Sequence, residues 1–288
     1  MLNVNIFFLF IYCFMEQYNI CVYDSGIGGL DIARRLNKTL RLQKIIYFCD
    51  SKNMPYGNKS FFKLKKIIIK NVEFLIHNYK IKIFVLACNT ATMVALKELR
   101  EKFKDVWFVG TEPAIKPALN NLEKKDKILV LCTKNTKKYS KILKKYKKNK
   151  QITIFAVKKL AHLIENNYFK LNTIFNEVSV LFKKLLVKNY TRVVLGCTHY
   201  PFIKNHLQKI FTNAIFFDGA EGVVKQTVKI VRDCCKHERV YIKSTIKRKK
   251  FLLSFKKNYL SFNNNKFDII SSKKLNEKDI KKYLNQPV

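Results

Sequence analysis

Two cysteines occupy matching places in the sequence. Cys88 lies in the run Leu86-Ala-Cys-Asn-Thr90 and Cys197 in the run Leu195-Gly-Cys-Thr-His199, and each run follows an apolar segment. A buried structural role is the usual interpretation of one such cysteine, but the repetition favours chemistry. Thiols at the strand ends of two facing lobes can take a proton from one face of a carbon atom and return one to the other face. Racemisation needs this arrangement, with acid and base exchanging roles with direction.

Polar residues follow both cysteines directly. Asn89 and Thr90 come after Cys88, where a helical pattern begins, and they offer an amide and a hydroxyl to a polar ligand. The free N–H groups at the start of a helix also favour a thiolate. His199, two residues after Cys197, can poise the thiol or relay its proton, because imidazole titrates near neutrality. A structural histidine is the alternative, and no metal is expected, because no second pair of ligands is evident.

A glycine-rich loop is the third element. Asp24-Ser-Gly-Ile-Gly-Gly29 holds three of the eight glycines of the chain, between an apolar run and a helical pattern. Such loops let backbone N–H groups approach an anion, although the spacing is that of neither a dinucleotide fingerprint nor a P-loop. Asp24 could orient a substrate ammonium or a thiol. Asp24 or Ser25 could equally cap the helix.

A fourth segment runs from Asp50 to Gly57. Pro55 and Gly57 mark a turn, and the Tyr56 side chain and the Gly57 N–H could hold a carboxylate. Alone, this segment would indicate only a loop.

The elements that must position these residues alternate along the chain. Short apolar runs predict strands, and longer amphipathic patterns predict helices between them. The predicted strands are 20–23, 45–48, 81–87, 106–109, 128–131, 152–155, 192–195 and 214–217, with 251–255 as a further candidate, and the helical patterns include 30–40, 61–79, 91–103 and 174–188. This alternation implies parallel sheets with crossover helices.

An internal echo predicts how these elements are arranged. Besides the two cysteine motifs, Val22-Tyr-Asp-Ser25 resembles Val130-Leu-Cys-Thr133. We therefore expect an α/β fold of two pseudo-symmetric, doubly wound lobes with mainly parallel sheets and an active site in the cleft between them. Residues 1–14 are expected to be a dispensable extension, or Met15 the true start.

Composition limits the function classes. The formal net charge is +37, but the lysines are spread among many Asn, Ile, Phe and Tyr, as an AT-rich genome would impose. Nucleic acid is therefore not expected as the main partner, although the charge can attract an anionic substrate. The eight cysteines include no CxxC pair, and we expect reduced thiols in a cytoplasm. The apolar run 6–14 is too short to span a bilayer, so no membrane partner is expected.

Five runs carry a family resemblance. They are Tyr23 to Leu30, Asp50 to Gly57, Ala87 to Ala91, Gly110 to Ala114 and Gly196 to Pro201. Together they resemble the glutamate racemase family of the aspartate/glutamate racemase superfamily. The resemblance implies interconversion of L- and D-glutamate without pyridoxal phosphate, any other cofactor or metal, in order to supply peptidoglycan synthesis. Members of the family are often homodimers, and their chain returns to the first lobe at its end. The resemblance therefore implies a first lobe of residues 1–111 and 218–288 and a second lobe of residues 112–217.

The resemblance also implies residue roles. Cys88 and Cys197 would donate and accept the proton, and Asp24 and His199 would assist the adjacent thiols. The residues expected to bind substrate are Asp24, Ser25, Tyr56, Gly57, Asn89, Thr90, Thr198 and His199. A supporting role is expected for Asp50, Thr133, Thr136 and Glu165.

Several positions depart from the family pattern. Val157 and Lys158 stand where a Cys-Pro pair is usual, and His162 stands where Pro is common. Further departures are Tyr139, Ile142 and the pair Asp218-Gly219. They leave open a weakly active racemase. Two further functions also stay open, namely a racemase of aspartate or another small acidic amino acid, and a basic protein that binds nucleic acid or topoisomerase.

Overall fold

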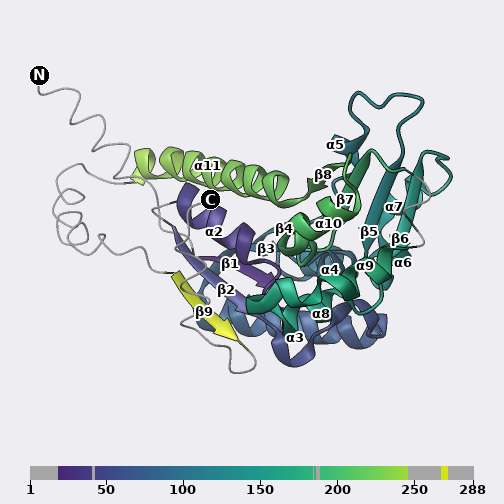
Figure 1. Cartoon of the computed structure of the whole chain (residues 1–288). Coiled ribbons are helices and arrows are strands. Elements are labelled where there is room, and N and C mark those ends of the chain that lie inside the picture. The colour runs from purple at the N-terminus through teal and green to yellow at the C-terminus, as the bar shows by residue number, and fades with distance from the viewer. Residues whose placement is uncertain (1–18, 41–42, 184, 186–188, 246–266, 272–288) are drawn as a thin grey trace, which may run out of the picture.

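The computed structural model describes residues 19–40, 43–183, 185, 189–245 and 267–271, and it contains two parallel sheets (Figure 1). The first sheet has the order β4-β3-β1-β2-β9 and the second the order β6-β5-β7-β8, with every pairing parallel. The strands are β1 (Asn19–Asp24), β2 (Lys44–Cys49), β3 (Ile81–Leu86), β4 (Trp107–Gly110), β5 (Ile128–Cys132), β6 (Ile152–Ala156), β7 (Arg192–Gly196), β8 (Ile215–Asp218) and β9 (Phe267–Ser271).

The two sheets repeat one strand order. The sequence β2-β1-β3-β4 in the first corresponds to β6-β5-β7-β8 in the second. The echo in the sequence follows this correspondence, because Val22-Tyr-Asp-Ser25 ends β1 and Val130-Leu-Cys-Thr133 ends β5. The predicted α/β fold with two pseudo-symmetric lobes is therefore confirmed. β9 has no counterpart and brings the chain back to the first sheet; the predicted lobe boundaries stay a prediction.

Helices cover both faces of the first sheet, as Figure 1 shows. Ile20 and Val22 point to the face covered by α2 (Leu30–Thr39) and α11 (Ala220–Thr245). Cys21 and Tyr23 point to the face covered by α3 (Phe61–Tyr79) and α4 (Asn89–Lys102). Because successive strand residues face opposite sides and both sides are buried, the strand is continuously apolar.

The second sheet is covered in the same way. One face packs against α8 (Leu160–Asn166), α9 (Phe175–Phe182) and α10 (Lys204–Ile210). The other packs against α5 (Ile115–Leu119) and α7 (Lys141–Tyr146). The remaining short elements are α6 (Lys134–Tyr139) and the 3₁₀ turns at Ser51–Asn53, Tyr56–Asn58, Tyr168–Ile174 and Tyr200–Ile203.

The chain passes between the two sheets twice, and the two passages touch. The first leaves β4 through Thr111 and Glu112, and the second leaves β8 through Gly219. A Cβ atom on Gly219 would lie 3.0 Å from the Glu112 carbonyl oxygen and 3.2 Å from Thr111 Cγ2. The two crossing segments therefore lie side by side.

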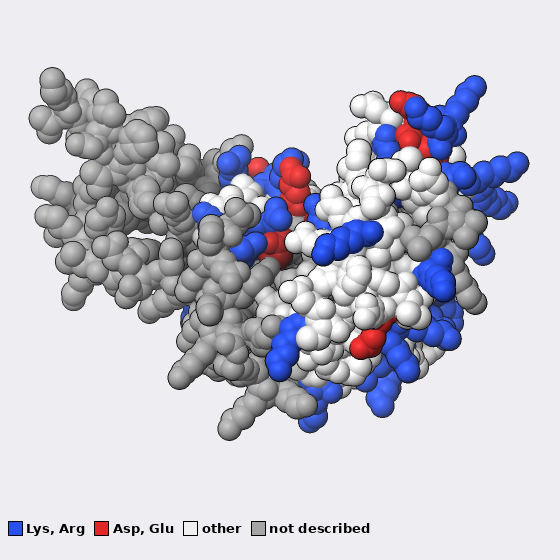
Figure 2. All heavy atoms as spheres, viewed as in Figure 1, with Lys and Arg blue, Asp and Glu red and all other residues white. Residues whose placement is uncertain are grey.

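Basic side chains are dispersed on the face drawn in Figure 2. Lys and Arg lie around its margin and over both lobes, with broad neutral areas between them. Across the described part of the chain, no helix has both the length and the apolar character needed to cross a bilayer.

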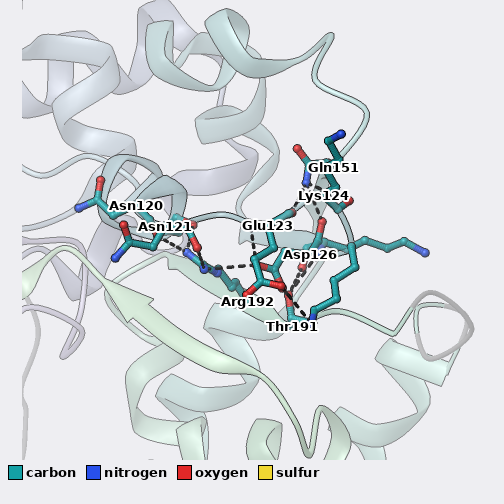
Figure 3. A network of polar contacts seen from close by, with 11 residues as sticks. Asn120, Asn121, Glu123, Lys124, Asp126, Gln151, Thr191 and Arg192 are labelled. Carbon is teal, nitrogen blue, oxygen red and sulfur yellow. Dashed lines mark hydrogen bonds and ion pairs between the residues drawn. The ribbon is translucent and has the colours of Figure 1, made fainter.

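A polar network ties the amino-terminal ends of the strands in the second lobe (Figure 3). Arg192, the first residue of β7, donates to the carbonyl oxygens of Ala118 at 3.0 Å and Asn121 at 2.6 Å. Its guanidinium also contacts Asp126 at 3.3 Å, and the Asp126 carboxylate accepts from Thr191 at 2.9 Å. This network lies at the end of the second sheet opposite to Cys197.

Some predicted elements differ from the structure. α9 is shorter than the helical pattern 174–188, part of which lies outside the described residues. The helix over 91–103 begins at residue 89, because Cys88 serves as its N-cap. α11 and β9 were not predicted. The predicted strand 251–255, the apolar run 6–14 and Met15 lie outside the described residues.

Candidate active site

The strand order of each sheet creates one crevice at its carboxyl end. After the central strand, the chain continues first on one side and then on the other, and loops at such a switch point diverge and leave room for a ligand. In the first sheet, Ser25 follows β1 and Cys88 is the second residue after β3. In the second sheet, Thr133 follows β5 and Cys197 follows β7. The two thiols therefore stand at equivalent switch points.

One cavity collects residues from both switch points. Its volume is about 370 Å³, which suits a small molecule. It is lined by both cysteines and by six other predicted site residues, namely Ser25, Tyr56, Gly57, Thr90, Thr133 and His199. A larger hollow of about 710 Å³ lies beside α11 and the segment 110–117, and neither cysteine lines it. We therefore take the smaller cavity as the candidate active site.

The two thiols have different surroundings. Cys88 is 6% exposed and Cys197 is 7% exposed. The Cys88 thiol donates to Ser25 Oγ at 3.8 Å. Burial raises the pKa of Cys88 well above its ordinary value, and the Asp24 carboxylate adds to the rise. The Ala91 N–H at the start of α4 lowers it, but by less. The helix start therefore does favour the thiolate of Cys88, as expected, but burial and Asp24 outweigh it.

Cys197 instead lies beside a histidine that is held in an ion pair. His199 Nδ1 is 3.8 Å from Cys197 Sγ, and Nε2 is 2.7 Å from Glu165 Oε2. Burial lowers the pKa of His199, but the hydrogen bonds with Cys197 and Glu165 outweigh burial and raise it well above its ordinary value. These contacts therefore favour the protonated form of the imidazole next to Cys197, whereas Cys88 has a neutral hydroxyl beside it.

Asp24 lies behind the cavity wall. Its side chain is fully buried, with Oδ1 accepting from the Gly26 N–H at 3.0 Å and Oδ2 from Thr198 Oγ1 at 3.0 Å. Burial raises the pKa of Asp24 to about 6, although the nearby His199 opposes the rise. The carboxylate thus joins the glycine-rich loop of the first lobe to the second cysteine motif.

The glycines of this loop permit close contact between the lobes. A Cβ atom on Gly26 would lie less than 3.0 Å from the Glu165 carboxylate, and one on Gly28 would lie 2.6 Å from His199 Nδ1. Neither glycine has a positive φ, so the need for Gly is steric. The Ile27 N–H donates to Glu165 Oε2 at 2.9 Å. The loop does hold an anion, as expected, but that anion is a carboxylate of the protein.

Three threonine hydroxyls form a second contact between the lobes. Thr90 Oγ1 lies 2.9 Å from Thr133 Oγ1 and 3.2 Å from Thr136 Oγ1, and the latter two are 3.0 Å apart. Thr133 also caps α6. A Cβ atom on Gly57 would lie 2.8 Å from Thr133 Cβ, so this glycine too allows close approach.

Two predicted ligands have internal hydrogen-bond partners. The Tyr56 hydroxyl donates to Asp50 Oδ2 at 2.5 Å, and Asp50 is fully buried. Asn89 Nδ2 donates to the Thr111 carbonyl oxygen at 3.4 Å. Neither Asn89 nor Asp50 is among the residues that line the cavity. Their predicted roles toward a ligand stay predictions.

Comparison with known proteins identifies the family. The model of the Asp/Glu/Hydantoin racemase family matches residues 29–227. The chain belongs to the Asp/Glu racemase family. Glutamate racemase of Clostridium novyi is 38% identical over 232 residues, which span 78% of this chain and 88% of the relative. Glutamate racemase 2 of Bacillus subtilis is 36% identical, over 73% of this chain and 81% of the relative.

Solved racemases have the same fold. The Escherichia coli glutamate racemase, in complex with L-glutamate and the activator UDP-MurNAc-ala, has a TM-score of 0.68 and 26% identity, covering 75% of this chain and 83% of that one. The Francisella tularensis glutamate racemase with D-glutamate has a TM-score of 0.70 and 24% identity, covering 94% of each chain. The predicted family and isomerase class are confirmed.

The candidate site also contains residues that the sequence alone did not single out. Asn135 Nδ2 donates to the carbonyl oxygens of Tyr56 and Lys59, both at 2.9 Å, and so fixes the turn that borders the cavity. Lys159 and Met54 line the cavity itself. Asn135 follows Thr133 closely at the end of β5, and this position is the feature of the sequence that could have indicated its role. Among the described residues, no cluster of three or more His, Cys, Asp or Glu could hold a metal ion.

Proposed function

We propose that this chain interconverts L- and D-glutamate by proton transfer between two cysteines, without a cofactor. The observation that carries the proposal is that Cys88 and Cys197, from different sheets, line one cavity of about 370 Å³. The names of the relatives support glutamate as substrate. D-glutamate formed in this way would supply peptidoglycan synthesis in the cytoplasm. A homodimer stays a prediction.

The unequal surroundings of the thiols suggest a starting state. Cys88 holds its proton because burial and Asp24 disfavour its thiolate. His199 Nδ1 lies 3.8 Å from Cys197 Sγ, where it can exchange a proton with that sulfur. In one direction, Cys197 removes the α-proton and forms an S–H bond, while the Cys88 S–H bond breaks and its proton goes to the opposite face of the carbon. In the other direction the two sulfurs exchange these roles.

Neighbouring groups would hold the substrate between the sulfurs. The hydroxyls of Ser25, Thr90 and Thr133 line the cavity and can donate to carboxylate oxygens. Substrate contacts of Asp24, Tyr56, Gly57, Asn89, Thr198 and His199 are part of the proposal. Glu165 would act through His199, by orienting the ring and keeping it charged.

The experiment follows the circular dichroism signal of L-glutamate over time, with purified protein and no added cofactor. We expect Cys88→Ala and Cys197→Ala each to lower turnover by a factor of ~10²–10⁴. In D₂O, deuterium should enter the α-position during turnover of the unaltered enzyme. Cys21→Ala is the matched control, because this thiol is fully buried in the middle of β1 and does not line the cavity. Near-normal turnover by either active-site variant would refute the two-cysteine proposal.

The same assay with aspartate tests a different substrate. Faster racemisation of aspartate than of glutamate would replace the proposed substrate while leaving the two-cysteine chemistry intact. The comparisons do not favour a nucleic-acid or topoisomerase-binding protein.

A further inference from the structure

The residues that line the candidate active site carry more positive than negative charge. Lys159 is the one Lys or Arg among the described residues that line the cavity, and no Asp or Glu lines it. The nearby carboxylates have partners within the protein: Asp24 accepts from Thr198, and Glu165 pairs with His199. A ligand in the cavity therefore meets a net positive wall.

Lys159 has an unusual local conformation. It precedes α8 with φ 62° and ψ −12°, in the left-handed region that side-chain-bearing residues rarely adopt. The next turn of the chain places Ala161 and His162 on the same cavity wall. Within the described part of the chain, the Lys159 ammonium has no hydrogen bond or ion pair. The backbone thus brings an exposed lysine to the wall of the cavity.

The other polar groups of the wall cannot replace this cation. His199 also lines the cavity, but its ring is paired with the Glu165 carboxylate at 2.7 Å, which offsets a positive charge on the ring. Ser25, Thr90 and Thr133 present neutral hydroxyls, which hydrogen-bond a carboxylate and a carboxamide about equally well. A carboxamide has nearly the shape of a carboxylate but no charge. Discrimination between the two therefore needs a charged partner, since a hydrogen bond to a charged group is stronger than one between neutral groups.

We propose that Lys159 is a specificity-determining residue that selects ligands with a second carboxylate over ligands with a carboxamide at that position. The inference rests on the proposed function for the identity of the ligand, an amino acid with two carboxylates. It goes further because it assigns the choice between a dicarboxylic acid and its monoamide to one side chain of the second lobe.

Lys158 provides a matched control. It is the neighbouring lysine, it is exposed, and it does not line the cavity. Lys158→Gln and Lys159→Gln change the net charge of the protein equally. Long-range attraction of anions therefore falls by about the same amount in both variants, and a difference between them reports the local contact. Lys159→Arg keeps the charge and should retain the selectivity.

The test measures binding of glutarate and of its monoamide, glutaramate, by calorimetry. We expect the unaltered protein to bind glutarate more tightly than glutaramate. Lys159→Gln should reduce the ratio of the two dissociation constants by roughly 5- to 10-fold, a change that lies between the effect of losing an exposed ion pair and that of losing a buried charged hydrogen bond. Lys158→Gln and Lys159→Arg should leave the ratio within about twofold.

Other outcomes overturn the inference. Equal changes of the ratio in Lys158→Gln and Lys159→Gln would mean that the charge acts only at long range. Equal weakening of both ligands by Lys159→Gln would mean that the variant disturbs the loop, and absence of glutarate binding to the unaltered protein would also refute the inference. Calorimetry needs no turnover, so glutarate selectivity in a protein that fails to racemise glutamate would refute the proposed function alone.

Discussion

Gly28→Ala tests the contact between the lobes with one added methyl group. The new Cβ atom would lie 2.6 Å from His199 Nδ1 and 2.9 Å from His199 Cε1, and it would be closer still to Thr198 Oγ1. His199 is buried and hydrogen-bonded to Glu165, and the half-buried Thr198 is hydrogen-bonded to Asp24. The loop or the second cysteine motif must therefore shift.

The expected change in the free energy of unfolding of Gly28→Ala is the sum of two opposing terms. Overpacking of a closely packed site costs typically about 1–3 kcal/mol. Because Gly28 does not have a positive φ, alanine fits its backbone, and the smaller entropy of the unfolded chain returns about 0.4–1 kcal/mol. The net loss is then about 1–2 kcal/mol, or a fall in Tm of roughly 2–8 °C for a chain of this size. A displacement of the catalytic groups of less than an ångström should lower kcat/KM by about 10- to 100-fold.

The assay pairs thermal unfolding with glutamate racemisation, and Gly222→Ala is the control. Gly222 lies in α11, and a Cβ atom there would meet nothing within 4 Å. This alanine should raise stability by about 0.5–1 kcal/mol and leave turnover unchanged. If Gly28→Ala matched Gly222→Ala in both Tm and turnover, the steric explanation of the glycine-rich loop would be wrong.

Three further predictions concern other groups. Burial raises the pKa of Asp24 to about 6 in the folded state, whereas its ordinary value in the unfolded chain is 3.8. The contribution of this raised pKa to the free energy of unfolding is therefore fully present below pH 3.8 and is lost as the pH rises through 6. Asp24→Asn should remove this loss, on the order of 3 kcal/mol, which denaturant titrations at several pH values would detect as a flatter profile. Arg192→Lys should lower the free energy of unfolding by about 1–3 kcal/mol, because a lysine ammonium cannot hydrogen-bond all the carbonyl oxygens that the guanidinium contacts (Figure 3). Turnover of the folded protein should persist. Tyr200 is fully buried and its hydroxyl has no hydrogen-bond partner among the described residues. Tyr200→Phe should therefore leave Tm unchanged or raise it, and a fall of several degrees would contradict this accounting.

The sequence predicted the strands well because both faces of each sheet are buried. β3 and β7 are runs of apolar residues that end directly before polar motifs, so their ends could be assigned within one residue. The predicted helix 61–79 corresponds to α3 in full, since its apolar residues recur at helical spacing. β9 escaped prediction because it lies in a Lys- and Asn-rich segment and pairs through its backbone with β2, a contact that leaves no local signal.

The site was predicted in part, for a physical reason. That Cys88 and Cys197 line one cavity could be predicted because each follows a strand, and the strand order brings such positions together. The partners of a side chain depend on tertiary packing, which spacing does not reveal. The sequence therefore could not show that the Ile27 N–H holds Glu165, or that burial keeps the proton on Cys88.

The paired crossings between the sheets limit how the two halves of the molecule can move. With a single linking segment, one lobe could rotate about any axis relative to the other. Two adjacent segments, through Thr111 and Gly219, instead favour rotation of the lobes about the line that joins the segments. Each lobe carries one of the two cysteine motifs that line the cavity, so a rotation about this line would change the width of that cavity.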